Sequence, residues 1–152
     1  MAQEIERKFL LAEGATSPVF GDYIKQKLRQ GYISGDKDKN VRIRLTADKA
    51  ILGIKFTNEA ITDEYEYEIP YADGEAIYAK TEWKLEKKRL SFDINKVHYD
   101  LDIYPNGLHI VEAEFKTVDQ MNKWVKPDWI GEEVSGQSEY SNVVLAKENL
   151  EF

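Results

Sequence analysis

The stretch 4-EIERKFLL-11 near the start of the chain has a charged side chain at every second position. These are Glu4, Glu6 and Lys8. Successive side chains of a β-strand point to opposite faces, so the stretch predicts a strand with two carboxylates and an ammonium group on one face. Two carboxylates this close repel each other unless a cation or a proton lies between them. The rest of the chain must therefore supply a partner for them.

The same two-residue alternation recurs along most of the chain. It predicts eight strands, at residues 4–11, 28–33, 41–46, 50–57, 63–69, 84–92, 96–104 and 108–115. Short turn-like segments join them, such as GDKDKN before Val41 and YPNG before Leu108, and short connections favour antiparallel hairpins. Helices are expected to be few and short, at residues 18–26, 71–81, 119–125 and 139–148.

Nearly every long predicted strand carries its charges on one face, and the sign of charge is sorted by strand. The basic faces hold Arg42, Arg44, Lys55, Lys87 and Arg89, and the acidic faces hold Glu64, Glu66, Glu68, Asp100, Asp102, Glu112 and Glu114. An ordinary solvated sheet face is the alternative, but it would more often mix signs along a strand. We predict a mainly β fold with a few helices (α+β). Its strands can join into a closed eight-stranded antiparallel β-barrel, which forms a hydrophilic tunnel if the charged face points inward. The outward apolar face would be covered by the helices.

Length and composition set limits on the class of protein. The 152 residues suit a single domain spanning residues 1–152. The absence of cysteine excludes disulfides and thiolate ligands, and a net charge of -7 argues against nucleic acid as a partner. No apolar run reaches membrane-spanning length and the first ten residues do not resemble a signal peptide. We therefore expect a cytoplasmic protein without a membrane partner.

The two kinds of charge indicate two kinds of ligand. Clusters of carboxylates without cysteine suit hard divalent ions such as Mg²⁺ or Mn²⁺. Lysines and arginines suit a polyanion, because the guanidinium fork matches phosphate oxygens. Two histidines are too few for a histidine-rich metal site. His98 shares the face of Asp100 and Asp102, so it could lie in the tunnel, at its rim or in a structural position. His109 has the opposite parity to Glu112 and is expected to be structural.

These charged motifs follow one another in a recognisable order. They are EIERK at residues 4–8, VRIR at 41–44, GIK at 53–55, YEYEI at 65–69, KKR at 87–89, YDLDI at 99–103, VEAEF at 111–115 and YSN at 140–142. The ordered set resembles the CYTH family, also called triphosphate tunnel metalloenzymes. The resemblance extends over nearly the whole chain. It implies a tunnel-shaped barrel and metal-dependent cleavage of a triphosphate group.

The resemblance also implies roles for individual residues. The metal-binding carboxylates would be Glu4, Glu6, Glu112 and Glu114. The triphosphate would be bound by Lys8, Arg42, Arg44, Lys55, Lys87 and Arg89. Further acidic lining, or a second metal, would involve Glu66, Glu68, Asp100 and Asp102. Glu4 and Glu6, with Lys8, would form the catalytic group, in which a carboxylate beside the metal orients or deprotonates water.

Several activities remain compatible with such a tunnel. Hydrolysis of inorganic tripolyphosphate ranks first, because the compact chain leaves little sequence for a nucleoside pocket. The alternatives are a nucleoside or thiamine triphosphatase, an adenylate cyclase of the same family, and a non-catalytic polyphosphate-binding module. Outward residues such as Tyr65 and Tyr67 could support a homodimer or lie under helices. Glu139 stands where family members often have a basic residue, so that phosphate contact is either missing or supplied elsewhere, for which Lys147 is the candidate substitute.

Overall fold

The computed structural model describes residues 2–15 and 22–152. Its strands are β1 (Ala2–Leu11), β2 (Ile24–Gly35), β3 (Lys39–Leu45), β4 (Ala50–Asn58), β5 (Ile61–Ile69), β6 (Trp83–Ile94), β7 (Val97–Ile103), β8 (His109–Phe115) and β9 (Ile130–Glu133). Its helices are α1 (Tyr71–Lys80), α2 (Val118–Lys123), the 3₁₀-helix η1 (Ser138–Tyr140) and α3 (Asn142–Ala146). The strands form one sheet in the order β5-β4-β3-β2-β6-β7-β8-β1-β9, and a further pairing joins β5 to β1.

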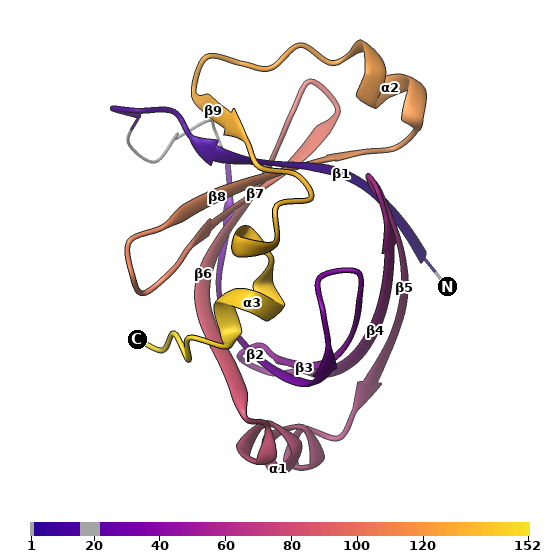
Figure 1. Ribbon diagram of the computed structural model, residues 1–152, viewed down its shortest axis with the longest axis vertical. Coiled ribbons are helices and arrows are strands. Elements are labelled where there is room, and N and C mark those ends of the chain that lie inside the picture. Colours follow the sequence, from indigo (N-terminus) through magenta and orange to yellow (C-terminus); the bar gives the residue numbers. More distant parts are fainter. Residues whose placement is uncertain (1, 16–21) are drawn as a thin grey trace.

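β1 closes the sheet into a ring because its two halves pair with different strands (Figure 1). Its first half pairs with β5 and its second half with β8, where Glu6 lies opposite Glu114 and Lys8 opposite Glu112. The predicted closed barrel of eight antiparallel strands is thereby confirmed. β9 pairs with the end of β1 outside the ring. Its four residues, IGEE, carry no alternating pattern and so predict no strand.

Two apolar clusters cover the outside of the ring, as the alternation predicts. Trp124 and Trp129, which follow α2, pack against a cluster that includes Leu101 and Val111 on β7 and β8. α1 packs over β3 and β4 around Ile43. The apolar side chains of these strands therefore face outward under the helical segments, and the charged side chains of opposite parity face the lumen.

α3 packs differently from the other two helices. Its Val143 and Leu145 belong to a cluster with Leu85, Tyr104 and Ile110, all of them buried. These last three share the parity of the lumen-facing charges on β6, β7 and β8. Figure 1 accordingly shows α3 within the outline of the ring. The expectation that helices cover only the outward face was incomplete, because part of the tunnel has apolar lining and is filled by α3.

The predicted helix at 139–148 was wrong in its extent. η1 ends at Tyr140, Ser141 has extended backbone (φ -77°, ψ 144°), and α3 begins at Asn142. The backbone is held at this break, because the ammonium group of Lys8 donates a hydrogen bond to the Tyr140 carbonyl. The predicted helix at 18–26 lies partly outside the described residues, and its described end, from Ile24, belongs to β2. Within the described residues, no helix has the length and apolar character of a membrane span.

Replacement of Gly74 by alanine tests the packing of α1 on the ring. A Cβ at this position would lie 2.3 Å from the Cβ of Ala50 on β4, so the helix would have to shift. Overpacking of this kind costs about 1–3 kcal/mol, against about 1 kcal/mol gained in helix propensity. We expect Gly74→Ala to lower the free energy of unfolding measured with urea. The double variant with Ala50→Gly should recover most of the loss, and strictly additive effects would contradict the contact.

Candidate functional site

The lumen contains a cavity of about 170 Å³ beside α3. Residues of β1 to β5 and β8 line it, together with the loops that join β2 to β3 and β4 to β5, the segment 134–137 after β9 and the start of α3. The predicted site residues that line it are Glu6, Lys8, Arg42, Lys55 and Glu112. The structure thus brings two of the expected metal-binding carboxylates and three of the expected phosphate-binding cations around one space. Such a mixture of charges suits an anion that is bound together with a cation.

Arg42 and Lys55 share an acidic partner that was missing from the predicted site. The Lys55 Nζ lies 3.0 Å and the Arg42 Nη2 lies 3.8 Å from Oε1 of Glu64, which is 4% exposed. The sequence contained the signal, because Glu64 lies on the same face as Glu66 and Glu68 of the YEYEI motif. Of those two expected residues, Glu66 lies 3.5 Å from Arg42 near the surface and Glu68 is exposed.

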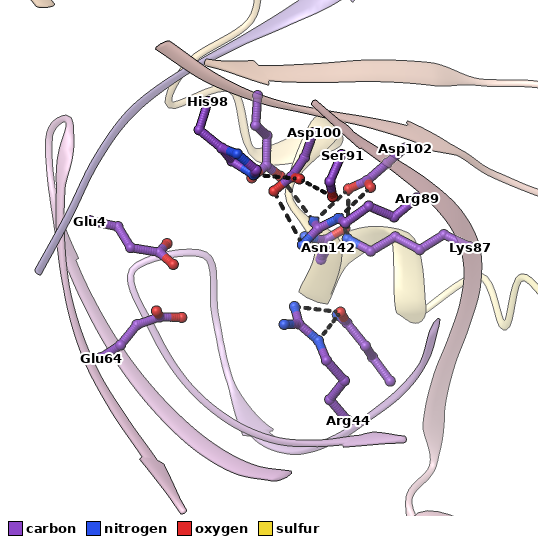
Figure 2. A network of polar contacts seen from close by, with 12 residues as sticks. Glu4, Arg44, Glu64, Lys87, Arg89, Ser91, His98, Asp100, Asp102 and Asn142 are labelled. Carbon is purple, nitrogen blue, oxygen red and sulfur yellow. Dashed lines mark hydrogen bonds and ion pairs between the residues drawn. The ribbon is translucent and has the colours of Figure 1, made fainter. Parts of the chain in front are cut away.

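Glu4 and Glu64 lie on the same side of the lumen (Figure 2). Burial raises the pKa of Glu4 to about 8; Lys55 opposes this rise and a hydrogen bond with Glu64 adds to it. Burial also acts to raise the pKa of Glu64, but the bond to Glu4 and the charge of Lys55 lower it to about 2. Without a cation, these opposite shifts favour a proton on Glu4 and an ionised Glu64.

Arg44 faces the lumen without lining the cavity. Its Nε and Nη2 donate hydrogen bonds of 3.0 and 2.9 Å to Oε1 of Gln30, whose amide nitrogen donates to the Tyr32 hydroxyl. Burial lowers the pKa of Arg44 to about 10, and repulsion from Arg42 and Arg89 contributes. Arg44 is still a cation at neutral pH. Gln30 is fully buried but uncharged, so a pattern of charges along the strands does not reveal it.

Lys87 and Arg89 converge on Asp102 (Figure 2). The Lys87 Nζ lies 2.8 Å from Asp102 Oδ2, and Arg89 makes a two-pronged contact of 2.7 and 2.9 Å to the same carboxylate. Although burial opposes ionisation, the two cations hold the pKa of Asp102 well below its usual range. Asn142 of α3 accepts hydrogen bonds from Lys87 and from the Tyr104 hydroxyl. These two expected phosphate ligands are thus already held by a buried carboxylate.

His98, Asp100 and Glu114 form a compact group in the lumen. One ligand atom from each lies within 4.8 Å of the others. His98 Nε2 lies 3.0 Å from Asp100 Oδ1, and Nδ1 lies 2.8 Å from Asp93 Oδ1. A carboxylate on the second ring nitrogen commonly orients a metal-binding histidine. This group is consistent with metal binding, and the lumen position of His98 resolves what its sequence left open.

The four carboxylates expected to bind metal are Glu4, Glu6, Glu112 and Glu114. They come from the neighbouring strands β1 and β8 and extend along one wall. Burial raises the pKa of Glu6, and the charge of Glu112 adds to the rise; burial also raises the pKa of Glu114. In the described part of the chain, the compact group of ligand atoms joins Glu114 to Asp100 and His98 instead of to the other three.

Lys147 does not replace the basic residue for which it was the candidate substitute. Its Nζ lies 4.6 Å from the ring centroid of Trp83, and both Lys147 and Glu139 are exposed at their positions in the chain. The residue that does bring a further ammonium group to the cavity is Lys37, from the loop between β2 and β3. The loop itself is charged on almost every residue, so its sequence does not distinguish Lys37 from its neighbours.

Asp102→Asn should strongly destabilise the protein, because it removes the carboxylate that pairs with buried Lys87 and takes from Arg89 its two-pronged partner, leaving Arg89 with Asp100 at 3.4 Å. Removal of one member of a buried ion pair costs about 3–5 kcal/mol. A urea titration of the free energy of unfolding measures the loss. Asp119→Asn is the matched control, since its ion pair with Lys123 at 3.1 Å is exposed and worth about 0–1 kcal/mol. Equal effects of the two substitutions would show that Asp102 does not compensate buried charge.

His98→Gln should change how stability depends on pH in chelator-treated protein. The hydrogen bond to Asp100 raises the pKa of His98 to about 9; burial opposes this and Asp93 assists. The folded state then binds more protons than the unfolded state between pH 6.5 and about 9. The contribution of His98 to stability is complete below pH 6.5 and is lost as the pH rises through about 9. Melting temperatures should show this decline in the wild type and not in the variant; parallel profiles would refute it.

Comparison with known proteins identifies the family, although no protein-family model matches the chain. The inorganic triphosphatase of Acetivibrio thermocellus is 37% identical over 151 residues, which cover 97% of this chain and 95% of that protein. The inorganic triphosphatase of Nitrosomonas europaea is 33% identical over 149 residues, covering 94% and 96%. A crystal structure of an inorganic triphosphatase has a TM-score of 0.69 at 32% identity, covering 97% of this chain and 96% of that one. The chain therefore belongs to the CYTH-like triphosphate tunnel family, as the order of its motifs predicts.

Proposed function

We propose that this chain hydrolyses inorganic tripolyphosphate with the help of a divalent cation, Mg²⁺ or Mn²⁺. The observation that carries the proposal is the cavity inside the ring, where Lys8, Arg42 and Lys55 lie around the same space as Glu6 and Glu112. Ammonium and guanidinium groups bind phosphate oxygens, and carboxylates bind the cation that bridges to them. The activity named for the two curated relatives supports the proposal.

The lining of the cavity favours a bare polyphosphate over an organic triphosphate. Among the described residues, Tyr32 is the aromatic side chain that lines it, and its hydroxyl accepts a hydrogen bond from Gln30. The aliphatic lining is limited to Ala60, Val134 and Val143. Sites for drug-sized organic molecules are mostly apolar and aromatic. A nucleoside or thiamine group would find little such surface here.

The carboxylates of the lumen suit a hard divalent ion. Burial raises the pKa values of Glu4, Glu6 and Glu114, so a cation beside them would stabilise their ionised forms. We assign the ion to the wall formed by these three residues and Glu112, with Asp100 and His98 beside Glu114. When bound, the ion would neutralise phosphate charge and make an attacking water more acidic.

Different residues of the chain bind the phosphates, supply positive charge and orient the attacking water. Lys8, Arg42 and Lys55 hold the phosphate oxygens in the cavity, while Arg44, Lys87 and Arg89 contribute positive charge from the neighbouring wall. With a cation bound, which would favour their ionised forms, Glu4 or Glu6 would orient the water and accept its proton. Attack of this water on a terminal phosphorus breaks one P–O bond of the anhydride and releases orthophosphate and diphosphate. Asp102 keeps Lys87 and Arg89 in place throughout.

A substrate panel with and without metal tests this function. We expect phosphate release from tripolyphosphate with Mg²⁺ or Mn²⁺, and a loss of roughly 100-fold or more in kcat/KM for Glu6→Gln and Glu114→Gln. Glu132→Gln, an exposed carboxylate on β9, is the control and should retain wild-type activity.

Each failure of this experiment has a separate meaning. Full activity in excess chelator would refute the metal requirement, and wild-type activity of both Glu6→Gln and Glu114→Gln would refute the residue assignment. No hydrolysis of tripolyphosphate with either metal would refute the function. Product analysis on ATP separates linear from cyclic nucleotide and so identifies a cyclase.

A further inference from the structure

The loop that joins β2 to β3 reaches the mouth of the lumen cavity. Lys37 and Asp38 of this loop line the cavity together with Lys8, Arg42 and Lys55. Figure 1 shows the loop projecting across the opening of the ring. It therefore brings a further ammonium group to a space already lined by three cations.

The loop is a preorganised turn. Its closing hydrogen bond runs from the Asp36 N–H to the Lys39 carbonyl at 2.7 Å, and Asp36 Oδ1 accepts from the N–H groups of Asp38 and Lys39. Asn40 on β3 donates to the Asp36 carbonyl, and the Thr57 N–H on β4 donates to the Asp38 carbonyl at 2.7 Å. A loop tied at so many points loses little conformational entropy when a ligand binds to it.

The charges of the loop leave Lys37 available to an anion. Its Nζ lies 2.9 Å from Asp38 Oδ1, and the two side chains are 35% and 52% exposed. An exposed ion pair of this kind is weak, so a phosphate oxygen can replace the carboxylate on Lys37. Further inside, the Nε of Arg42 is buried without a hydrogen-bond partner. A buried unpaired donor that lines the cavity favours an acceptor such as a phosphate oxygen.

We propose that Lys37 is a substrate-binding residue that holds the outer end of the polyphosphate at the cavity mouth, and that Asp38 competes with the substrate for it. This inference rests on the proposed function. The inner phosphates would lie against Arg42, Lys55 and Lys8, and the outermost one against Lys37. The turn holds Lys37 at the cavity mouth, and Asp38 weakens binding enough for the charged products to leave.

Three variants of the same turn test this inference. Lys37→Gln should raise KM for tripolyphosphate about 3- to 10-fold and leave kcat within about twofold, because Lys37 contacts the phosphate chain away from the reacting atoms. Asp38→Asn should lower KM about 2- to 5-fold, since it frees Lys37 and removes a like charge. Lys39→Gln is the control, because Lys39 is exposed in the same turn and does not line the cavity. The Lys37→Gln effect should shrink as ionic strength rises.

Two results would overturn the inference. One is equal KM values for Lys37→Gln and Lys39→Gln; the other is a rise in KM for Asp38→Asn, which would indicate general disruption of the turn. Calorimetric titration of tripolyphosphate in chelator measures the same differences without turnover. If the wild type binds tripolyphosphate with this order of affinities but does not hydrolyse it, the proposed function fails and the role of Lys37 stands.

Discussion

The pairing of β1 with both β5 and β8 is the constraint on which the rest of the structure depends. A sheet that ended at β1 or β5 would leave its charged face in water, where side chains of both signs need no particular partners. Closure turns that face inward and removes it from bulk solvent. Every charge in the lumen must then be compensated by another group, because an uncompensated ion in a low-dielectric interior is costly.

The chain meets this requirement with three buried acceptors. Asp102 compensates Lys87 and Arg89, Glu64 compensates Lys55 and Arg42, and the neutral Gln30 accepts both hydrogen bonds from Arg44. These contacts hold the basic side chains in extended positions before any ligand arrives. Beside these cations, Glu4, Glu6 and Glu114 have raised pKa values, so a bound cation would stabilise their ionised forms, whereas burial acts to raise the pKa of Glu112 but Lys8 and Arg89 lower it. A metal ion with a polyphosphate is a ligand pair that satisfies both kinds of charge.

α3 determines which part of the tunnel remains open. Because its apolar side chains pack on Leu85, Tyr104 and Ile110, one part of the lumen is filled and the cavity is confined to the part beside β1, β3 and β4. Asn142 at the start of α3 bonds Lys87, and the Tyr140 carbonyl just before it accepts from Lys8, so the C-terminal segment is tied to the basic side chains themselves. The loop with Lys37 lies at the mouth that remains.

The sequence by itself determined the eight strands of the ring, the face on which each charge lies and the family, because alternation with period two and the order of motifs are local properties. The resemblance of its motifs to the family also predicted a shared site, and five of the residues it named, Glu6, Lys8, Arg42, Lys55 and Glu112, line one cavity. Only the tertiary structure decided which partner each charge takes. Glu64, Gln30 and Lys37 acquire their roles from register and turn geometry across different strands, and α3 enters the lumen because inward apolar residues of separate strands meet there. The positions of these residues relative to one another are set by strand pairing around the whole ring, and no single stretch of residues encodes them.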